Sequence, residues 1–240
     1  MLSCTQKIRS LLLRFRSFIP FWQHWIISNL VGKSNQLVLD VGCGPGESAA
    51  SLKSRLGSLD IIGCDIYMPS LLACKKGQTY RDVICCDITS LPMKPRSFSV
   101  CIAEEVIEHL KREEGFELME VLENIATEVI VVTTPNGFSS QEGNELDNRY
   151  ETHKSGWTVS DFQSLGYKVW GNGFPRMAQI QIDHPKIRPF LQLAHVVTNA
   201  ISYFIPSAGG GLIAAKIVGK EWPDCLPYGP RNLRLNTLVV

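Results

Sequence analysis

The amino-acid sequence lacks a sizeable net charge, a Cys-x-x-Cys pair and, before Asp40, any acidic residue. Its formal charge is +1 at pH 7, so the balance of charge indicates no particular partner. The 8 cysteines never show the spacing typical of a zinc or redox site. Several of them, including Cys64 and Cys101, lie in apolar runs, where a free thiol acts as a small hydrophobic side chain. We therefore expect a reducing, intracellular compartment, either the cytoplasm or the mitochondrion.

The missing acidic residues leave residues 1–29 as a segment in which basic and apolar side chains interleave. This pattern predicts a basic amphipathic helix, and its arginines are too frequent for a secretory signal or a membrane span. Three alternatives stay open: a helix that packs across the domain and covers the ligand, a mitochondrial presequence, and a membrane-surface contact. We expect one domain over 30–220 and a tail over 221–240.

What the sequence does contain is a regular alternation of strand-like and helix-like segments. The strand-like runs cover residues 36–41, 60–65, 82–87, 97–103 and 128–134. Alternation of this kind predicts right-handed crossovers and a mostly parallel sheet of the α/β class. The runs are continuously apolar, which indicates helices on both faces of the sheet. Ligands of such sheets bind at the carboxyl ends of the strands.

The stretch QLVLDVGCGPGESAA, residues 36–50, joins the end of a strand to a glycine-rich turn and the start of a helix. Gly42, Gly44 and Gly46 permit tight curvature and the close approach of a ligand. A dinucleotide site would have a glycine in place of Glu47, and an acid there would sit badly against a pyrophosphate. The turn therefore predicts a ligand with a cationic group rather than a polyphosphate.

Three carboxylates stand at the ends of three successive strands: Asp40, Asp65 and Asp87. A carboxylate at Asp65 is placed to accept hydrogen bonds from two ribose hydroxyls. Asp87, together with the amide of Ile88, is placed to meet an adenine-like amine and a ring nitrogen. Three such acids in order are hard to explain by packing alone.

Four segments in order resemble the motifs of class I S-adenosylmethionine-dependent methyltransferases, in their small-molecule, methyltransferase type 11-like branch. They are VLDVGCGPG, IIGCDI, DITSLPM with the following SFSVCIAEEVIEHL, and VIVVTTPNG. The resemblance covers about residues 30 to 220. It implies a Rossmann-like, doubly wound seven-stranded sheet in the order 3-2-1-4-5-7-6, with the last strand antiparallel and helices on its flanks. Strands six and seven would then fall at 167–173 and 212–219.

The same resemblance implies S-adenosyl-L-methionine as the cofactor. The glycines would line its methionine part, Asp65 would hold the ribose, and Asp87 with Ile88 would frame the adenine. Glu104 stands where relatives have a small residue, and it either favours a cationic substrate or points outwards. The complete set of expected cofactor-binding residues is Asp40, Gly42, Cys43, Gly44, Gly46, Asp65, Ile66, Asp87, Ile88 and Glu104.

Methyl transfer from a sulfonium needs little from the protein, because in-line positioning supplies much of the barrier reduction. A base is needed only for a nucleophile that carries a proton of high pKa. The candidates that we assign to catalysis are Glu105, His109 and His153. Glu108 and His109 also fit a purely structural role in the turn after the fourth strand.

Residues 136–157 form a polar segment that is long for a plain connection, and such loops often cover active sites. His153 and Trp157 are its best candidates for contact with a substrate. Trp157 equally fits packing before a short helix that Thr158 or Ser160 caps and Gly166 ends.

Glu105, Glu108 and His109 have the i, i+3, i+4 spacing of one helical face, and His153 follows later in the chain. This set is similar to that of metal-dependent small-RNA 2′-O-methyltransferases, which implies a Mn²⁺ or Mg²⁺ ion. The EVIEH stretch is also widespread in relatives without a metal, so we assign no metal ligand. A non-catalytic protein that binds the cofactor and serves as an assembly partner is a further alternative.

The sequence therefore predicts methyl transfer to a small-molecule or lipid-like acceptor. Residues 189–211 carry no formal charge apart from His195, and their helical part is short for a membrane span. Together with the basic N-terminal segment, they favour an apolar acceptor. The domain has no dense basic stripe, so we do not expect a nucleic-acid partner.

Overall fold

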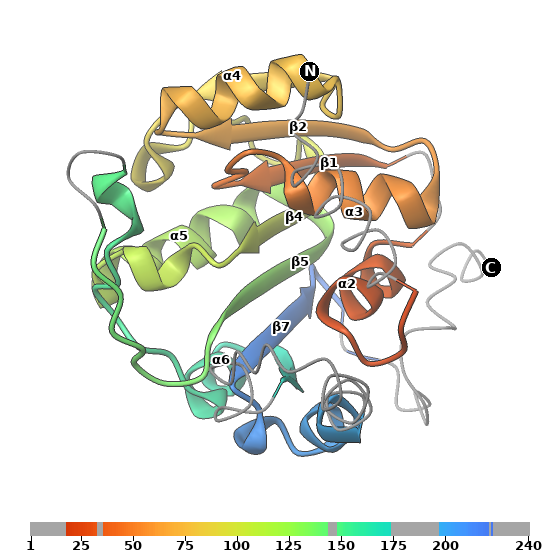
Figure 1. Cartoon of the computed structure of the whole chain (residues 1–240), viewed down its shortest axis with the longest axis vertical. Coiled ribbons are helices and arrows are strands. Elements are labelled where there is room, and N and C mark those ends of the chain that lie inside the picture. The colour runs from red at the N-terminus through yellow and green to blue at the C-terminus, as the bar shows by residue number, and fades with distance from the viewer. Residues whose placement is uncertain (1–17, 33–35, 144–147, 174–196, 221, 223–240) are drawn as a thin grey trace, which may run out of the picture.

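The computed structural model describes residues 18–32, 36–143, 148–173, 197–220 and 222. These residues form a seven-stranded sheet in the order β3-β2-β1-β4-β5-β7-β6, with helices on both faces (Figure 1). Neighbouring strands are parallel except for β7, which runs antiparallel to β5 and β6. The predicted fold class and strand order are confirmed.

The strands are β1 (Leu37–Val41), β2 (Asp60–Asp65), β3 (Asp82–Cys85), β4 (Phe98–Glu104), β5 (Ala126–Pro135), β6 (Lys168–Asn172) and β7 (Gly211–Ile217). The helices are α2 (Gln23–Val31), α3 (Glu47–Leu56), α4 (Met68–Gly77), α5 (Arg112–Ile125) and α6 (Val159–Ser164), and residues 197–204 are also helical. Short 3₁₀ turns occur at η1 (Ile88–Ser90), η2 (Ile107–His109), η3 (Arg149–Glu151) and η4 (Pro206–Ala208).

Side chains of the central strands alternate between the two faces of the sheet. On β4, Val100 and Ile102 pack in one apolar cluster with α2 and α3. Cys101 and Ala103 pack in the other cluster, with α5 and α6. Because both faces are covered, residues 100–103 of β4 are all apolar and buried. Each large apolar side chain stabilises the fold by about 1.5–3 kcal/mol on burial.

The helix α2 belongs to the body of the domain. Its Ile26 and Ile27 are fully buried, and Figure 1 shows α2 beside α3. The helix crosses the boundary that we expected after residue 29. Residues 1–17, 174–196 and 223–240, with His195 and most of the expected tail, lie outside the described residues. Within the described parts of the chain, no helix has both the length and the apolar character needed to cross a membrane.

The chain after β4 does not continue as the helix that the spacing of Glu105, Glu108 and His109 suggested. Glu105 has a left-handed backbone, with φ of 53°, and the regular structure that follows is only the three-residue turn η2. The amide of Glu105 donates to the carbonyl oxygen of Thr133 at 3.1 Å, which holds this residue beside β5. The expectation of one helical face is therefore wrong, because the end of the strand imposes a turn.

Trp157 lies in the core rather than on the substrate side. Its side chain is fully buried, contacts Phe116 and Phe162, and donates a 2.9 Å hydrogen bond to Ser155 Oγ. The structure thus favours the packing alternative for this residue. Thr158 is the N-cap of α6, as one of our two capping alternatives predicted.

The substitution Gly115→Ala should destabilise the fold, because a Cβ at this position would lie 2.4 Å from the Trp157 ring. Overpacking of this kind costs about 1–3 kcal/mol. Gly77→Ala is the matched control, since a Cβ there first meets Thr79 at 3.5 Å, and alanine in a helix gains about 0.5–1 kcal/mol over glycine. Urea denaturation of both variants checks this. Equal stability of the two would show that Trp157 does not fill this space.

Candidate functional site

The glycine turn after β1 has the shape that the sequence predicts. Gly42, Gly44 and Gly46 all have positive φ, at 66°, 50° and 89°. A Cβ at Gly42 would lie 2.5 Å from a methyl group of Val106, and one at Gly46 would lie 2.9 Å from the Tyr80 ring. The turn therefore needs glycine both for its backbone and for its close packing.

Asp65, the last residue of β2, holds this turn in place. Its carboxylate accepts a 2.8 Å hydrogen bond from the Gly44 amide and a 2.7 Å bond from the Tyr67 amide. A carboxylate has about four lone-pair positions, so this arrangement leaves acceptor capacity for ligand hydroxyls. The turn and the acid thus form one unit at the carboxyl edge of the sheet.

Asp40 is a buried carboxyl group at the end of β1. It accepts a 2.7 Å hydrogen bond from the Tyr80 hydroxyl. Burial raises the pKa of Asp40 to about 7, and the nearby carboxylates of Glu104 and Asp65 add to this, whereas the bond from Tyr80 opposes it. Tyr80 was missed by our sequence analysis, because no local pattern links a residue before β3 to the glycine turn.

Glu104 points into the protein, which excludes the alternative that it points outwards. Its side chain is 12% exposed and lies 3.0 Å from His24 Nε2. It also accepts a 2.8 Å bond from Gln23 Nε2 and a 2.5 Å bond from Ser48 Oγ. Burial alone would raise the pKa of Glu104, but His24, Ser48 and Gln23 together lower it below its ordinary value. Helix α2 therefore covers the end of β4. No local pattern links Gln23 and His24 to Glu104, because about 80 positions separate them.

The other expected cofactor-binding residues lie along the same edge of the sheet. Asp87 is exposed, and its carboxylate accepts a 2.9 Å bond from the Thr89 amide at the start of η1. Ile66 and Ile88 are half-buried, whereas Cys43 is buried in a small cluster with Leu71 and Cys74. Contact of Asp87, Ile66, Ile88 and Cys43 with the cofactor stays a prediction.

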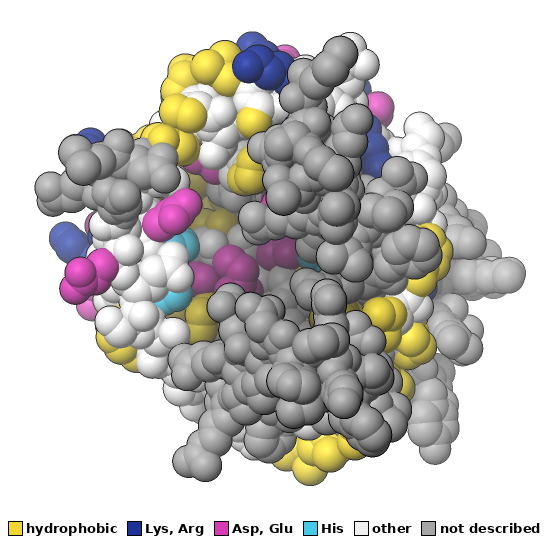
Figure 2. Space-filling view, viewed as in Figure 1, with side chains coloured by type: hydrophobic (Ala, Val, Ile, Leu, Met, Phe, Trp, Pro, Cys, Tyr) yellow, Lys and Arg dark blue, Asp and Glu magenta, His cyan; other side chains and the backbone are white. Residues whose placement is uncertain are grey.

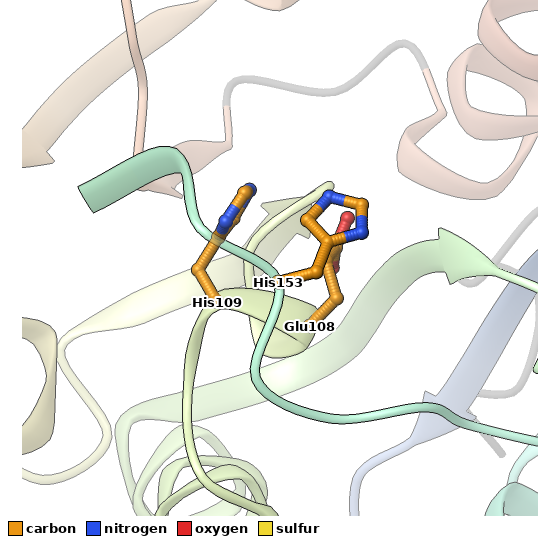
Figure 3. Close-up of side chains that lie close together, drawn as sticks. All are labelled: Glu108, His109 and His153. Atoms are coloured by element: carbon orange, nitrogen blue, oxygen red, sulfur yellow. The ribbon is translucent and has the colours of Figure 1, made fainter. Parts of the chain in front are cut away.

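A second group of side chains lies beside this edge. Glu108, His109 and His153 each place a potential ligand atom within 4.8 Å of the others, and Figure 3 shows the three together. Figure 2, which has the same view as Figure 1, shows acidic and histidine side chains around a hollow in the middle of the molecule. Two of the residues that we assigned to catalysis, His109 and His153, are thus brought together.

Glu105, the third residue that we assigned to catalysis, is placed differently. Its carboxylate accepts a 2.7 Å hydrogen bond from Thr133 Oγ1. Burial raises the pKa of Glu105. Burial also raises the pKa of Glu108, and the negative charge of the neighbouring Glu105 raises it further. Burial lowers the pKa of His109, so this imidazole is neutral at pH 7 and has a lone pair that can accept a proton.

The sequence is similar to the model of one protein family and to one curated protein. The family model of the methyltransferase domain matches residues 39–138. An uncharacterised protein of Methanocaldococcus jannaschii, MJ0638, is 26% identical over 145 residues, and this match spans 60% of this chain and 60% of the length of that relative.

Two solved structures have the same fold. One is a methyltransferase in a complex with the Haloferax volcanii methyltransferase activator Trm112, at 11% identity and a TM-score of 0.59, with 91% of this chain and 96% of that chain covered. The other is a SAM-dependent methyltransferase from Archaeoglobus fulgidus, at 20% identity and a TM-score of 0.53, with 88% and 96% covered.

The substitution Asp40→Asn should change how stability depends on pH. In the folded state Asp40 keeps its proton up to about pH 7, whereas its ordinary pKa is 3.8. Its contribution to stability is therefore fully present below about pH 4 and is lost as the pH rises through 7. Each tenfold change in proton affinity is worth about 1.4 kcal/mol, so relative to wild type the variant should gain about 2–4 kcal/mol between these pH values.

Urea denaturation across this pH range measures the difference. Asp82→Asn, at an exposed position at the start of β3, is the control and should follow the wild-type profile. Parallel profiles for wild type and Asp40→Asn would contradict a raised pKa at Asp40.

Proposed function

We propose that this chain is a class I S-adenosylmethionine-dependent methyltransferase and that it transfers a methyl group from S-adenosylmethionine to a small-molecule or lipid-like acceptor. The observation that carries the proposal is the joined unit of glycine turn and strand-end acid, in which the Gly44 amide donates to Asp65. This unit lies at the carboxyl edge of a doubly wound sheet, where ligands of such sheets bind.

The electrostatics of the edge support a cofactor that carries positive charge. Asp65 and Glu104 are the last residues of β2 and β4, the two strands that flank β1. The low pKa of Glu104 keeps its carboxylate ionised. S-Adenosylmethionine carries a sulfonium and an ammonium group, both of which gain free energy next to carboxylates in a partly buried site.

In this proposal the protein acts mainly by positioning. Asp65 holds the ribose hydroxyls, and the glycine turn lets the backbone approach the methionine part. A base is required only for an acceptor with a proton of high pKa. His109, which is neutral at pH 7, and His153 beside it would accept such a proton, with Glu105 next to β5 as the remaining candidate.

An apolar acceptor is supported by the surface of residues 197–205. Val197, Ile201, Phe204 and Ile205 have exposed fractions of 51%, 44%, 59% and 54%. Their spacing places them on one face of the helix at 197–204. An exposed apolar face of this kind is typical of a site that meets an apolar ligand or surface.

Calorimetric titration with S-adenosylmethionine and S-adenosylhomocysteine tests the cofactor. We expect micromolar binding to wild type and at least about a tenfold loss in Asp65→Ala, since a hydrogen bond to a charged group contributes about 1.5–3 kcal/mol. Asp60→Ala is the matched control, because Asp60 starts the same strand at its opposite end and is exposed. Failure of folded wild type to bind either compound would overturn the proposal.

The class of acceptor is tested by incubating the protein with methyl-labelled S-adenosylmethionine and a cell extract. A lipid-like acceptor predicts label in the organic phase after extraction, and a polar small molecule predicts label in the aqueous, low-mass fraction. Asp65→Ala provides the background. Label that appears only in RNA or protein would exclude both acceptor classes.

A further inference from the structure

The fold places Cys43, which lies in the glycine turn, against Cys74 of helix α4. The Cys74 thiol donates a 3.1 Å hydrogen bond to the carbonyl oxygen of Gly44, and Cys43 Sγ lies 3.8 Å from the same oxygen. A hydrogen bond also joins the two thiols. No local spacing indicates this pair, because α4 comes to the turn only through its packing on β2 (Figure 1).

The two sulfur atoms have little free space around them. A Cβ at Gly63 would lie 2.9 Å from Cys43 Sγ, and one at Gly46 would lie 3.3 Å from Cys74 Sγ. Leu71 completes the small cluster that encloses the pair. The sulfur atoms of a disulfide lie about 2 Å apart, closer than two hydrogen-bonded thiols. In so tight a space, an S–S bond would displace the turn or α4.

The pair lies just beneath the surface of the turn. Cys43 and Cys74 are 6% and 2% exposed. The next residues of the turn are more open, since Gly44 is half-buried and Pro45 is exposed. The bond from the Cys43 thiol lowers the pKa of Cys74, although burial and nearby carboxylates oppose this. Cys74 is therefore the better nucleophile of the two, and Cys43 is placed to attack it after oxidation.

Two other cysteines are also joined through their thiols, but they lie elsewhere. Cys64 belongs to β2 and Cys86 follows β3, so this pair includes no residue of the glycine turn. Cys101 differs from both pairs, because burial alone raises the pKa of its thiol to about 12. Among the described cysteines, Cys43 and Cys74 are thus the pair whose oxidation would act directly on the turn.

We infer that Cys43 and Cys74 form a redox-sensitive pair, which a peroxide converts to a disulfide, and that the disulfide form binds S-adenosylmethionine weakly. The effect on the cofactor rests on the proposed function, since the turn that moves also carries the Gly44 amide bonded to Asp65. In a reducing compartment both thiols are free at rest, and a transient disulfide there is usually regulatory or catalytic.

The reaction balances with hydrogen peroxide as the oxidant. The Cys74 thiolate attacks one peroxide oxygen, so that an S–O bond forms, the O–O bond breaks, and the departing hydroxide takes up the proton that Cys74 released. Cys43 then attacks the sulfenic acid on Cys74. The S–S bond forms, the S–O bond breaks, and a second water leaves with the proton of Cys43. Two thiols lose two electrons and two protons, and one peroxide becomes two water molecules.

Peptide mapping tests the bond itself. The full chain is treated with hydrogen peroxide, its free thiols are alkylated, and it is digested with trypsin and chymotrypsin, so that cleavage after Tyr67 separates Cys64 from Cys74. We expect a linked pair of peptides that contains Cys43 and Cys74 and that dithiothreitol separates. Linkage only between Cys64 and Cys86, or no linkage at all, would overturn the inference.

Calorimetric titration with S-adenosylhomocysteine measures the consequence for the cofactor site. Reduced wild type should bind, and peroxide-treated wild type should bind at least about tenfold more weakly, which is the effect of losing one hydrogen bond to a charged group. Dithiothreitol should restore the affinity. This recovery separates the disulfide from methionine sulfoxide, which dedicated enzymes reduce.

Two variants complete the test. Cys74→Ser retains a donor for the Gly44 carbonyl oxygen, so it should bind as reduced wild type does, before and after peroxide. Cys85→Ser, which removes an exposed thiol, should lose affinity with peroxide as wild type does. If Cys74→Ser fails to fold, the mapping and titration of wild type decide the matter.

The outcomes separate this inference from the proposed function. Equal affinity of linked and reduced wild type, or a loss that persists in Cys74→Ser, would overturn the inference and leave the proposed function standing. Folded, reduced wild type that does not bind the nucleoside would overturn both.

Discussion

The hydrogen bond from the Gly44 amide to the carboxylate of Asp65 joins the turn after β1 to the end of β2, and the candidate site is built around it. The turn has three glycines with positive φ, a backbone that other residues adopt only with strain. A second bond, from the Cys43 amide to the carbonyl oxygen of Cys64 at 3.0 Å, reinforces the connection. The conformation of the turn therefore depends on the neighbouring strand as well as on its own sequence.

The strand-end acids at this edge are stabilised in three different ways. Asp65 accepts hydrogen bonds from backbone amides. Asp40 accepts a hydrogen bond from the Tyr80 hydroxyl and has a raised pKa. Glu104 forms an ion pair with His24. Each of these interactions lowers the free-energy cost of placing the acidic side chains close together. Acidic side chains gather in a hollow on this face of the molecule (Figure 2). Helix α2 contributes Gln23 and His24, which lie about 80 positions from Glu104 in the sequence.

The sequence predicted the sheet well because its signals are local. The central strands contain continuous apolar runs, such as residues 100–103 of β4, because helices cover both faces of the sheet. The strand order came from a resemblance to a family rather than from these runs, since pairing is not local. The same limit explains why Tyr80, Gln23 and His24 were missed: their partners lie roughly 40 to 110 positions away.

One local pattern led to a wrong prediction, and the structure decides between two alternatives at another. The i, i+3, i+4 spacing from Glu105 to His109 predicts a helical face, yet the end of β4 imposes a left-handed residue before a short 3₁₀ turn. Glu108 and His109 still meet His153, because the loop at 152–155 is fastened to that turn. Trp157 belongs to a polar segment of the sequence, but its side chain is buried in the core, where it packs against Phe116 and Phe162.

A crystal structure of the chain with S-adenosylhomocysteine would show whether the glycine turn and Asp65 form the cofactor site. We expect the ribose hydroxyls to lie within hydrogen-bonding distance of the Asp65 carboxylate and the homocysteine part to follow the glycine turn. A nucleoside bound elsewhere, or one whose ribose does not reach Asp65, would contradict it.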